Sequence, residues 1–406
     1  MQAFIHFLVS LRKGIFVPLL SAIKRLLLFF VLVFIGLFFP FYMQTEIYDF
    51  FETEPFSGNT FYNPYQNWQN QGSQKANFHA HSKAWLGLTN GENTPKEIEK
   101  VYKAKGYGIA CLSNYQSISE QTASKGNIVP VYEHGFNLKK THQLAIGSES
   151  VSYLEFPFFQ NLSQKQMVIN RIKEHSRFVA LAHPTLRNGY SANDMAYLSN
   201  YDFIEVLSPY ANSLALWDTA LKHGKKEWCM ANDDLHAIKG ENMGRYYNII
   251  SGHNANIEMK LKEGCFYAMH ATTNMNDLSL ISLKMKEDSL FFEFKGNDLK
   301  VSAITEHGVF ENFNKGKGKL LFSKNCHYIR LEVLDESSNL LITNPVLREM
   351  KNNVAISPFA INDFETMLYR TAVLCFTILL LFICFSKVTA RVNYKVKDMI
   401  FRLTIE

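Results

Sequence analysis

Residues 77–82 read Asn-Phe-His-Ala-His-Ser, and this stretch decides the expected fold. It overlaps a short apolar run, Ala76–Phe78, that is typical of a buried strand. Alternate residues of an extended chain point the same way, so His79 and His81 present two imidazoles to one place. Together with carboxylates, imidazoles suit zinc, manganese or iron. The stretch therefore predicts a strand that ends at a metal site.

Further apolar runs follow this strand and alternate with helical stretches. The predicted strands are Tyr107–Leu112, Ile128–Tyr132, Gln143–Ile146, Phe178–Ala182, Asp202–Leu207 and Glu227–Ala231. The predicted helices are Pro95–Lys105, Lys165–His175 and Leu214–His223. Thr94 is the expected N-cap of the first helix, with Glu97 three residues later. Alternating strands and helices indicate a parallel sheet, and about seven strands predict a barrel related to the (β/α)8 type.

Polar residues stand at the ends of several predicted strands. They are Gly147-Ser148-Glu149, His183-Pro184 and Asp233-Asp234-Leu235-His236, and Glu205 lies within the sixth strand. The carboxyl ends of strands in a parallel barrel open on one face, so these side chains are expected to converge. A lone His-x-His is more often a surface pair. The additional ligand-type residues at the ends of other strands favour a metal site.

Seven segments match a known family in order and spacing. They read Asn-Phe-His-Ala-His-Ser (77–82), Leu-Thr-Asn-Gly with the following Thr-Pro-Lys-Glu helix (88–97), Gly-Ile-Ala-Cys-Leu-Ser-Asn-Tyr (108–115), Gly-Ser-Glu (147–149), Val-Ala-Leu-Ala-His-Pro (179–184), Ile-Glu-Val (204–206) and Asn-Asp-Asp-Leu-His (232–236). The chain thereby resembles the PHP superfamily of polymerase and histidinol phosphatase domains, which are metal-dependent phosphoesterases on a distorted seven-stranded barrel. The resemblance covers roughly residues 75 to 346.

The segment after the barrel resembles the small β appendage of the PHP branch that includes carbamate ester hydrolases. The matching stretches are Gly-Cys-Phe-Tyr-Ala (264–268), Tyr-Ile-Arg-Leu-Glu-Val (328–333) and Thr-Asn-Pro (343–345). Alternating strands at Leu290–Phe294, Leu299–Ile304 and His327–Val333 independently predict a piece of β-sandwich. The expected fold class is thus a distorted (β/α)7 PHP-type barrel and a small β-sandwich-like domain, flanked by two transmembrane helices.

The resemblance also implies a set of metal ligands. It places His79, His81, Glu149 and Asp234 on one ion, with Glu149 bridging to a second ion that His183 helps to bind. His236 matches a ligand of a further ion. We expect one or two divalent ions of manganese, zinc or iron per chain.

Three departures from the family pattern weaken the second ion site. Ser113-Asn114-Tyr115 stands where the family usually has Thr-Asp-His, and Asn90 stands where Asp is common. No clear match exists for the histidine that usually lies between the Glu and His-Pro motifs. His134 is either a replacement ligand or an ordinary hydrogen-bonded residue at the end of a strand.

The implied activity is metal-assisted hydrolysis of a phosphoester or a related ester, in a small-molecule or lipid-linked substrate. Arg187 is either a clamp for an anionic group or a solvated surface arginine. Tyr115 is a candidate hydrogen-bond donor to substrate, and Glu205 either orients a ligand or belongs to the rim of the core. The alternative is a degenerate PHP domain that binds a ligand or metal at the membrane without catalysis, which the missing imidazole favours.

The uncharged runs 26–43 and 371–386 predict membrane spans, and the second span extends to residue 367 if Arg370 reaches the interface. A buried core helix is the alternative for each run. Residues 1–25 carry four bases and no acid, and residues 387–406 carry five bases and two acids. By the positive-inside rule, both termini are expected in the cytoplasm and the intervening domain in an extracytoplasmic compartment such as the periplasm.

Composition narrows the remaining classes of function. The chain has 406 residues and a formal charge of +5, with 42 Lys and Arg against 37 Asp and Glu. The basic surplus lies in the two membrane flanks, so nucleic-acid binding is disfavoured for the net acidic remainder. The six cysteines include no Cys-x-x-Cys spacing, and Cys111 and Cys229 are expected in the core.

These observations predict a linear order of segments. The order is a basic cytoplasmic N-terminus (1–25), a transmembrane helix (26–43), a surface linker (44–74), a PHP-like barrel (75–253), a β-rich appendage (254–350), a second transmembrane helix (367–386) and a basic cytoplasmic tail (387–406).

Overall fold

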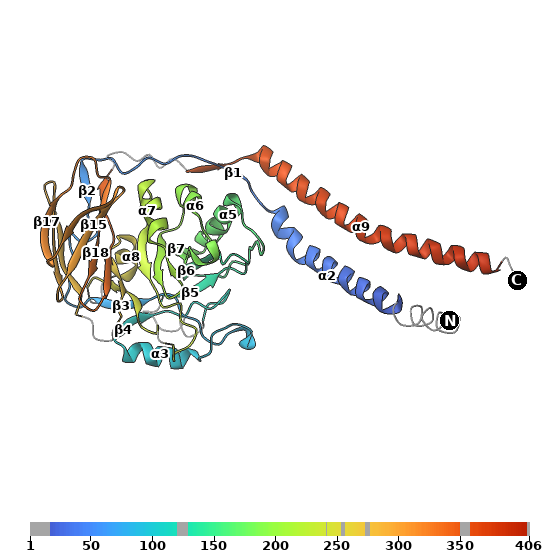
Figure 1. The fold of residues 1–406 in the computed structure, drawn as a ribbon, viewed down its shortest axis with the longest axis horizontal. Coiled ribbons are helices and arrows are strands. Elements are labelled where there is room, and N and C mark those ends of the chain that lie inside the picture. Colours follow the sequence, from blue (N-terminus) through green and yellow to red (C-terminus); the bar gives the residue numbers. More distant parts are fainter. Residues whose placement is uncertain are drawn as a thin grey trace, which may run out of the picture. The chain divides into compact units, whose positions relative to one another are not determined.

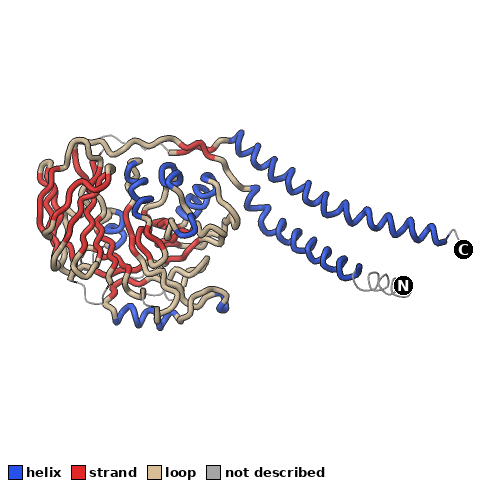
Figure 2. Tube along the Cα trace, viewed as in Figure 1, coloured by secondary structure: helices blue, strands red, loops and turns tan. Residues whose placement is uncertain are grey.

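The computed structural model describes residues 17–119, 129–240, 242–252, 256–272, 277–349 and 358–403. Most of the predicted basic N-terminus, residues 1–16, therefore lies outside the described residues. The chain divides into two compact units. One comprises Met1–Tyr48 with Ile361–Glu406, and the other comprises Asp49–Ala360. Figure 1 follows the chain through both units, and Figure 2 separates strands from helices.

A six-stranded mixed sheet forms one part of the unit Asp49–Ala360. Its order is β10 (Trp228–Ala231), β8 (Phe203–Ser208), β7 (Ser176–Ala182), β6 (His142–Ser148) and β5 (Val131–His134), with β9 (Ala211–Asn212) paired to β8. Strands β10, β8 and β7 run parallel, whereas β6 runs antiparallel to both β5 and β7. Helices α5 (Leu162–Lys173) and α7 (Leu214–Lys222) pack against this sheet, and α6 (Ala192–Tyr197) packs against α7.

A ten-stranded sheet forms the rest of the framework. Its order is β16 (Gly308–Phe313), β15 (Lys300–Thr305), β18 (Tyr328–Leu334), β19 (Leu340–Thr343), β12 (Phe266–His270), β11 (Tyr246–Ile250), β3 (Gln74–Asn77) and β4 (Tyr107–Ala110), with β20 (Val346–Glu349) on β18 and β2 (Thr60–Tyr62) on β20. One sheet therefore joins strands of the predicted barrel to strands of the predicted appendage.

The predicted appendage is built around an apolar core shared by two sheets. A three-stranded sheet comprises β13 (Ser279–Lys286), β14 (Ser289–Lys295) and β17 (Lys317–Leu321). Alternate residues of β14, including Leu290, Phe292 and Phe294, are buried in one cluster with Val301 and Leu331 of the ten-stranded sheet. The alternation of buried and exposed residues in these strands is what a face-to-face sheet packing requires.

Two further helices complete the unit. Helix α3 (Pro95–Ala104) has the capping box that the sequence predicts, because Thr94 accepts a hydrogen bond from the Glu97 backbone and Glu97 accepts one from the Thr94 backbone. Helix α8 (Ile257–Lys262) precedes β12. Strands β1 (Tyr48–Phe50) and β21 (Phe359–Ile361) form a separate two-stranded sheet.

The predicted linker 44–74, of which residues 56–74 were expected to run over the surface, contributes β1, β2 and the fully buried Tyr65. The Tyr65 hydroxyl donates to the Phe266 carbonyl at 2.5 Å and accepts from the Asn344 backbone N–H at 2.7 Å. These bonds attach the segment to the interior. Cys111 and Cys229 are buried and unpaired, as predicted.

The predicted closed barrel is wrong. The described strands form several sheets and no closed barrel, and antiparallel pairs interrupt the expected parallel order. Residues 135–141 join β5 to β6, and this connection is too short for the crossover that a parallel pair needs. Strand β6 therefore returns as a hairpin partner of β5.

Strand β10 is an edge strand of the six-stranded sheet, and within the described part of the chain no backbone ladder joins it to the ten-stranded sheet. The Asn248 side chain of β11 accepts from the Ala231 N–H at 3.0 Å and donates to the Ala231 carbonyl at 2.8 Å. The Asn344 side chain accepts from the Cys229 N–H at 2.8 Å. Amide side chains thus satisfy backbone groups that a neighbouring strand would otherwise pair.

Asparagine side chains also link the segment that follows β3 to the segment that follows β10. The Phe78 N–H donates to the side chain of Asn232 at 2.9 Å, and the Asp233 N–H donates to the side chain of Asn77 at 2.9 Å. Both asparagines are fully buried. This reciprocal pair fixes the segment that carries His79 against the segment that carries Asp234. We call these four asparagines the amide seam, made of Asn77, Asn232, Asn248 and Asn344.

The prediction of two membrane spans is also wrong. Among the described residues, only Asp363–Ile383 of α9 (Asp363–Leu403) is long and apolar enough to cross a membrane. Its 21 residues extend about 31 Å as a helix. The apolar part of α2 (Val17–Met43) is Leu28–Met43, which extends about 24 Å and falls short of a typical hydrocarbon core.

Within the smaller unit, α2 and α9 contact each other near Arg370. Its guanidinium donates to the carbonyl oxygens of Gln44 and Thr45, both at 3.1 Å. These are carbonyls just past the end of α2, where the backbone lacks intrahelical donors. The charge of Arg370, the eighth residue of the candidate span, therefore has backbone partners.

We predict that Asn248→Ala lowers the free energy of unfolding by about 2–4 kcal/mol, because it leaves the buried N–H and carbonyl of Ala231 without partners. Denaturation of the full chain in detergent, followed by tryptophan fluorescence, measures the change. Asn297→Ala, at an exposed amide, is the matched control and is expected to stay within about 0.5 kcal/mol. Equal stability of the two variants would contradict a structural role for the amide seam.

Candidate metal centre

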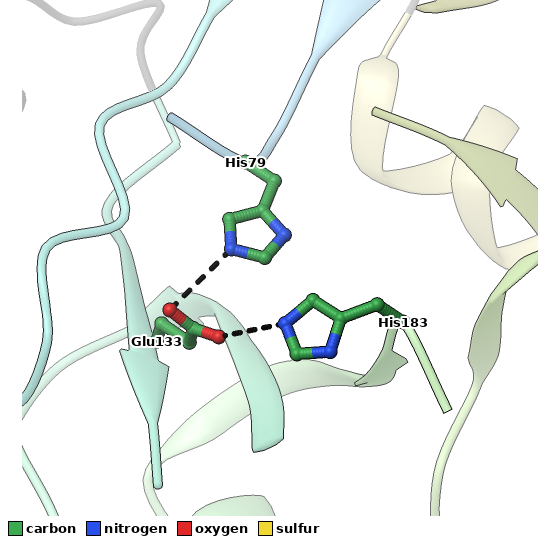
Figure 3. A group of neighbouring side chains, drawn as sticks. All are labelled: His79, Glu133 and His183. Atoms are coloured by element: carbon green, nitrogen blue, oxygen red, sulfur yellow. Dashed lines mark hydrogen bonds and ion pairs between the residues drawn. The ribbon is translucent and has the colours of Figure 1, made fainter. Parts of the chain in front are cut away.

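Imidazoles and carboxylates from five strands meet at one edge of the two sheets. The cluster comprises His79 and His81 beyond β3, Glu133 on β5, His142 at the start of β6, His183 beyond β7, and Asp234 and His236 beyond β10. All seven are buried except His236, which is 19% exposed. Figure 3 shows His79, Glu133 and His183 pointing toward one another.

Donor atoms of four residues lie near one another, and three of them, from His79, His81 and Asp234, form a set in which all pairs lie within 4.8 Å. The Nε2 atom of His79 is 3.2 Å from Nε2 of His81, 3.4 Å from Oε2 of Glu133 and 3.1 Å from Oδ1 of Asp234. The Nε2 atom of His81 is 3.1 Å from the Glu133 oxygen and 3.2 Å from the Asp234 oxygen. Ligands about 2.0–2.2 Å from a cation lie about 3.3–3.6 Å apart in a tetrahedron and about 2.8–3.1 Å apart in an octahedron. The spacing therefore suits a small divalent cation.

Two carboxylate oxygens of this group also need a positive partner. Within the described residues, Oε2 of Glu133 and Oδ1 of Asp234 are buried and accept no hydrogen bond. Leaving such oxygens without partners costs free energy, and coordination to a cation removes that cost. The chemistry and the geometry of these four residues agree that they can hold a metal ion.

A second donor group shares Glu133 with the first. Its other oxygen, Oε1, accepts from Nδ1 of His142 at 2.5 Å and lies 3.2 Å from Nε2 of His183. His79, Glu133 and His183 form a further set whose donor atoms lie within 4.8 Å of one another. Glu133 thus presents one oxygen to each group and can bridge two ions.

Glu205 of β8 contacts the His79 side chain and the His183 backbone. Its Oε1 lies 3.0 Å from Nδ1 of His79 and accepts from the side chain of Asn232 at 2.9 Å. Its Oε2 accepts from the His183 backbone N–H at 2.8 Å. A carboxylate on the far nitrogen of a ligating imidazole fixes the tautomer and the ring direction. Of the two roles that the sequence left open, the contacts favour the orienting one.

The cluster is strongly coupled electrostatically. Burial alone would raise the pKa of Glu133, but the imidazoles of His142 and His79 outweigh it and hold that pKa well below its usual range. Burial also opposes the shift at Asp234, whose pKa the imidazoles of His79, His81 and His183 hold below its usual range. Conversely, burial would lower the pKa of His79, but the neighbouring carboxylates, Asp234 first, raise it well above normal. Either imidazolium ions or a divalent cation can therefore neutralise the negative charge of these carboxylates.

Two of these residues have backbone conformations that side chains disfavour. His183 has φ of 29° and Asp234 has φ of 42°. Non-glycine residues at positive φ cost of order 1–3 kcal/mol each and cluster at functional sites. The turn after β7 and the turn after β10 hold their side chains toward the cluster at this cost.

The structure brings together most of the residues expected at the site and leaves Glu149 outside it. His79, His81, His183, Asp234 and His236 lie in the cluster, whereas Glu149 is exposed and its N–H donates to the His175 carbonyl. Because β6 runs antiparallel, its carboxyl end, which leads to Glu149, lies at the opposite edge of the sheet. The carboxylate that lies in the cluster in its place is Glu133.

Sequence reasoning missed His142 as well as Glu133. Only ten residues separate the predicted strands Ile128–Tyr132 and Gln143–Ile146, which is fewer than a parallel crossover needs. The short connection instead indicates a β-hairpin. A hairpin would have placed His142 beside Glu133, at the same edge as His79.

The other residues that the sequence analysis considered for the site lie in different environments. The ring of Tyr115 stacks on His81, with centroids 4.6 Å apart, and lies 5.6 Å from His142. Arg187 is exposed in the 3-10 helix η3 (Leu186–Asn188), and no hydrogen bond or ion pair joins it to the cluster within the described residues. His134 is buried and pairs with the Gln143 side chain at 3.1 Å, which is the ordinary role considered for it. Asn90 is exposed.

No protein-family model matches this chain, and no curated protein matches it. Two surface hollows, of about 620 and 230 Å³, lie at other residues, and no histidine lines either of them. The convergence of buried imidazoles and carboxylates therefore defines the candidate site on its own.

We predict that Glu133→Gln reduces bound metal strongly, because it removes a charge that both donor groups share, whereas Glu149→Gln leaves metal content unchanged. Inductively coupled plasma mass spectrometry of the purified full chain, after equilibration with zinc or manganese, measures ions per chain. The two substitutions are chemically identical and differ only in position. Loss of metal in Glu149→Gln with retention in Glu133→Gln would reverse the assignment of the bridging carboxylate.

Proposed function

We propose that this chain is a metal-dependent hydrolase of the PHP type that cleaves phosphoesters. The observation that carries the proposal is the pair of buried donor sets that share His79, with Glu133 presenting one oxygen to His81 and the other to His183. The sequence segments that resemble PHP domains supply His79, His81, His183 and Asp234 to these groups. Paired metal positions bridged by a carboxylate are the usual equipment for displacement at phosphorus.

A divalent cation in such a site lowers the pKa of water and polarises a phosphoryl or carbonyl oxygen. Residues of this chain position the donor groups. Glu133 holds the two groups side by side, and Glu205 keeps the His79 ring in one orientation through its Nδ1. A nucleophile and a phosphoryl group would consequently be held close together, which removes much of the entropic barrier to reaction.

Tyr115 is the residue best placed to supply a proton or hydrogen bond. Burial, reinforced by the carboxylates of Glu133 and Asp234, raises its pKa well above the usual value, so the hydroxyl stays protonated at neutral pH. Its ring lies on His81, at the position where PHP relatives usually carry another imidazole. Tyr115 can therefore donate to an oxygen of a bound ester.

A second candidate is a metal site without catalysis. The near-complete burial of the cluster favours it, because structural metal sites are closed whereas catalytic sites keep an open position. The tyrosine in place of an imidazole points the same way. In this case the chain would be a membrane-associated module that binds a metal ion or a ligand.

We further propose that α9 anchors the chain in a membrane with the unit Asp49–Ala360 outside the cytoplasm. The apolar part of α9 is followed by a segment, residues 387–406, with five bases and two acids. The positive-inside rule assigns such a flank to the cytoplasmic face. The large unit precedes α9 in the chain and would then lie on the other face.

We predict that the full chain, loaded with manganese, zinc or iron(II), hydrolyses p-nitrophenyl phosphate or bis(p-nitrophenyl) phosphate, and that EDTA abolishes this activity. Asp234→Asn is expected to lower kcat/KM at least roughly 100-fold, whereas Asp277→Asn, at an exposed carboxylate, leaves it unchanged. Tyr115→Phe should lower kcat without loss of metal.

The two candidate functions give different results in this assay. One or more bound ions per chain with no turnover of either phosphate, or of p-nitrophenyl acetate, would support the non-catalytic module. Fewer than one bound ion and no turnover would remove both candidates.

Topology is predicted separately. Green fluorescent protein fused after residue 406 should fluoresce in the cytoplasm, and Ser337→Cys, on an exposed turn, should react with a membrane-impermeant maleimide in intact cells. The native cysteines outside α9 are buried, so the unsubstituted chain is the labelling control. Fluorescence without labelling in intact cells would place both parts on the cytoplasmic side.

A further inference from the structure

Large apolar side chains stand exposed on the loops that leave the strands of the metal centre. The loop after β3 carries Trp85, Leu86 and Leu88, the loop after β5 carries Phe136 and Leu138, and the turn after β8 carries Tyr210. Leu86 and Leu88 are 106% and 89% exposed. Since these three strands also carry His79, Glu133 and Glu205, their loops emerge at the edge where the cluster lies. We call the six residues the apolar rim.

Contacts join the apolar rim to the cluster. The indole N–H of Trp85 donates to the Tyr115 carbonyl at 2.7 Å, and the Tyr115 ring stacks on His81. On another side, the Tyr210 ring lies 6.0 Å from His236, which lies 4.6 Å from His81. The apolar rim therefore borders the donor groups.

The loop after β3 holds its apolar residues outward at an energetic cost. Trp85 and Leu86 have φ of 51° and 56°, in the region that side chains disfavour, and Gly87 follows at 85°. The Trp85 indole bond and the bond from Thr89 to the Ala84 carbonyl hold this conformation. A strained loop that exposes a leucine completely has no explanation in folding alone, because burial of that leucine would favour the folded state.

Positive charge accompanies the apolar residues. Lys139 and Lys140 follow Phe136 and Leu138 in the loop after β5, and the Lys140 ammonium lies 5.6 Å from the Tyr115 ring. The segment of Arg187 approaches the same loop, because a Cβ at Gly189 would meet the carbonyl oxygens of Lys140 and Lys139. The surroundings of the cluster thus combine basic side chains with apolar ones.

We propose that the metal centre acts on an anionic amphiphile, a phosphate ester whose head group enters the donor groups and whose alkyl chain lies on the apolar rim. This inference rests on the proposed function and names its substrate class. Lysine, arginine and a cation suit the head group, and Trp85, Leu86 and Leu88 suit a chain of several methylenes. The candidate span of α9 would keep the centre in the membrane environment, where amphiphiles concentrate.

The test compares n-octyl phosphate, below its critical micelle concentration, with ethyl phosphate, using the metal-loaded full chain in phosphatidylcholine nanodiscs. We expect kcat/KM for octyl phosphate to exceed that for ethyl phosphate by roughly tenfold or more. The double variant Leu86→Ser/Leu88→Ser should remove about tenfold of the octyl phosphate value and leave ethyl phosphate unchanged. The control is Val309→Ser/Leu321→Ser, at two exposed apolar residues of β16 and β17, which are 60% and 61% exposed.

Binding is read independently of turnover through Trp85, which is half exposed, whereas Trp217 and Trp228 are buried and Trp68 is partly buried with its indole N–H on the Leu280 carbonyl. Octyl phosphate should shift the fluorescence emission to shorter wavelength, and Trp85→Phe should lose the shift. Nanodiscs without protein correct for partition of octyl phosphate into lipid. The Leu86→Ser/Leu88→Ser variant should require a roughly tenfold higher concentration for the same shift.

The outcomes separate this inference from the proposed function. Equal turnover of both phosphates, unaffected by Leu86→Ser/Leu88→Ser, would overturn the inference and leave the hydrolase intact. A shift of Trp85 emission by octyl phosphate without turnover of either ester would support binding of the amphiphile and remove the hydrolase. Emission that responds to phosphatidylglycerol in the nanodisc, and not to octyl phosphate, would assign the rim to the bilayer surface and overturn the inference.

A phosphate ester reaches the centre either as a lipid of the bilayer or as a free amphiphile. Dioleoyl phosphatidic acid, incorporated at a fixed fraction in the nanodiscs, tests the first source, and free octyl phosphate tests the second. Release of inorganic phosphate from one of them supports the proposal and identifies the source. Release from neither, with ethyl phosphate still cleaved, counts against it.

Discussion

The metal centre depends on the amide seam. Two sheets meet along β10 without a shared backbone ladder, so buried N–H and carbonyl groups need other partners there. Asn248 and Asn344 supply those partners to β10, and Asn77 and Asn232 tie the segment of His79 to the segment of Asp234. An asparagine amide carries one donor and one acceptor side, which is what an interrupted strand edge lacks. Together with backbone bridges at Ala80–Leu235 and Tyr115–Glu133, these amide bonds set the positions of the ligand-type residues.

Several local features of the fold could be predicted from the sequence. Short apolar runs located the strands to within a few residues, as in β7 and β8, and the Thr94 capping box located the start of α3. These features depend on neighbours along the chain, and the sequence displays such neighbours directly. The convergence of His79, His81, His183 and Asp234 could also be anticipated, because each lies just beyond a strand.

The sheet connections could not be predicted in the same way. A strand pattern by itself gives no direction, and the assumed all-parallel order disregarded the ten-residue connection predicted before β6, so Glu149 was placed at the wrong edge in place of Glu133. The amide seam leaves no pattern in sequence either, since an asparagine that completes a sheet edge looks like any asparagine of a loop. Span length was likewise misjudged for α2, where the apolar helix is shorter than a bilayer core. Long-range pairing and absolute length decide these outcomes, and neither is a local property.

Glu133 has a consequence for how the centre would fill. Its two oxygens face different donor groups, so the charge of the first ion to bind acts on the carboxylate that the second ion needs. The two affinities are then linked, and by thermodynamic reciprocity each occupancy changes the other by the same factor. Metal loading would then be a cooperative property of the two donor sets, and a centre with one ion would differ from a centre with two in its affinity for the next ion.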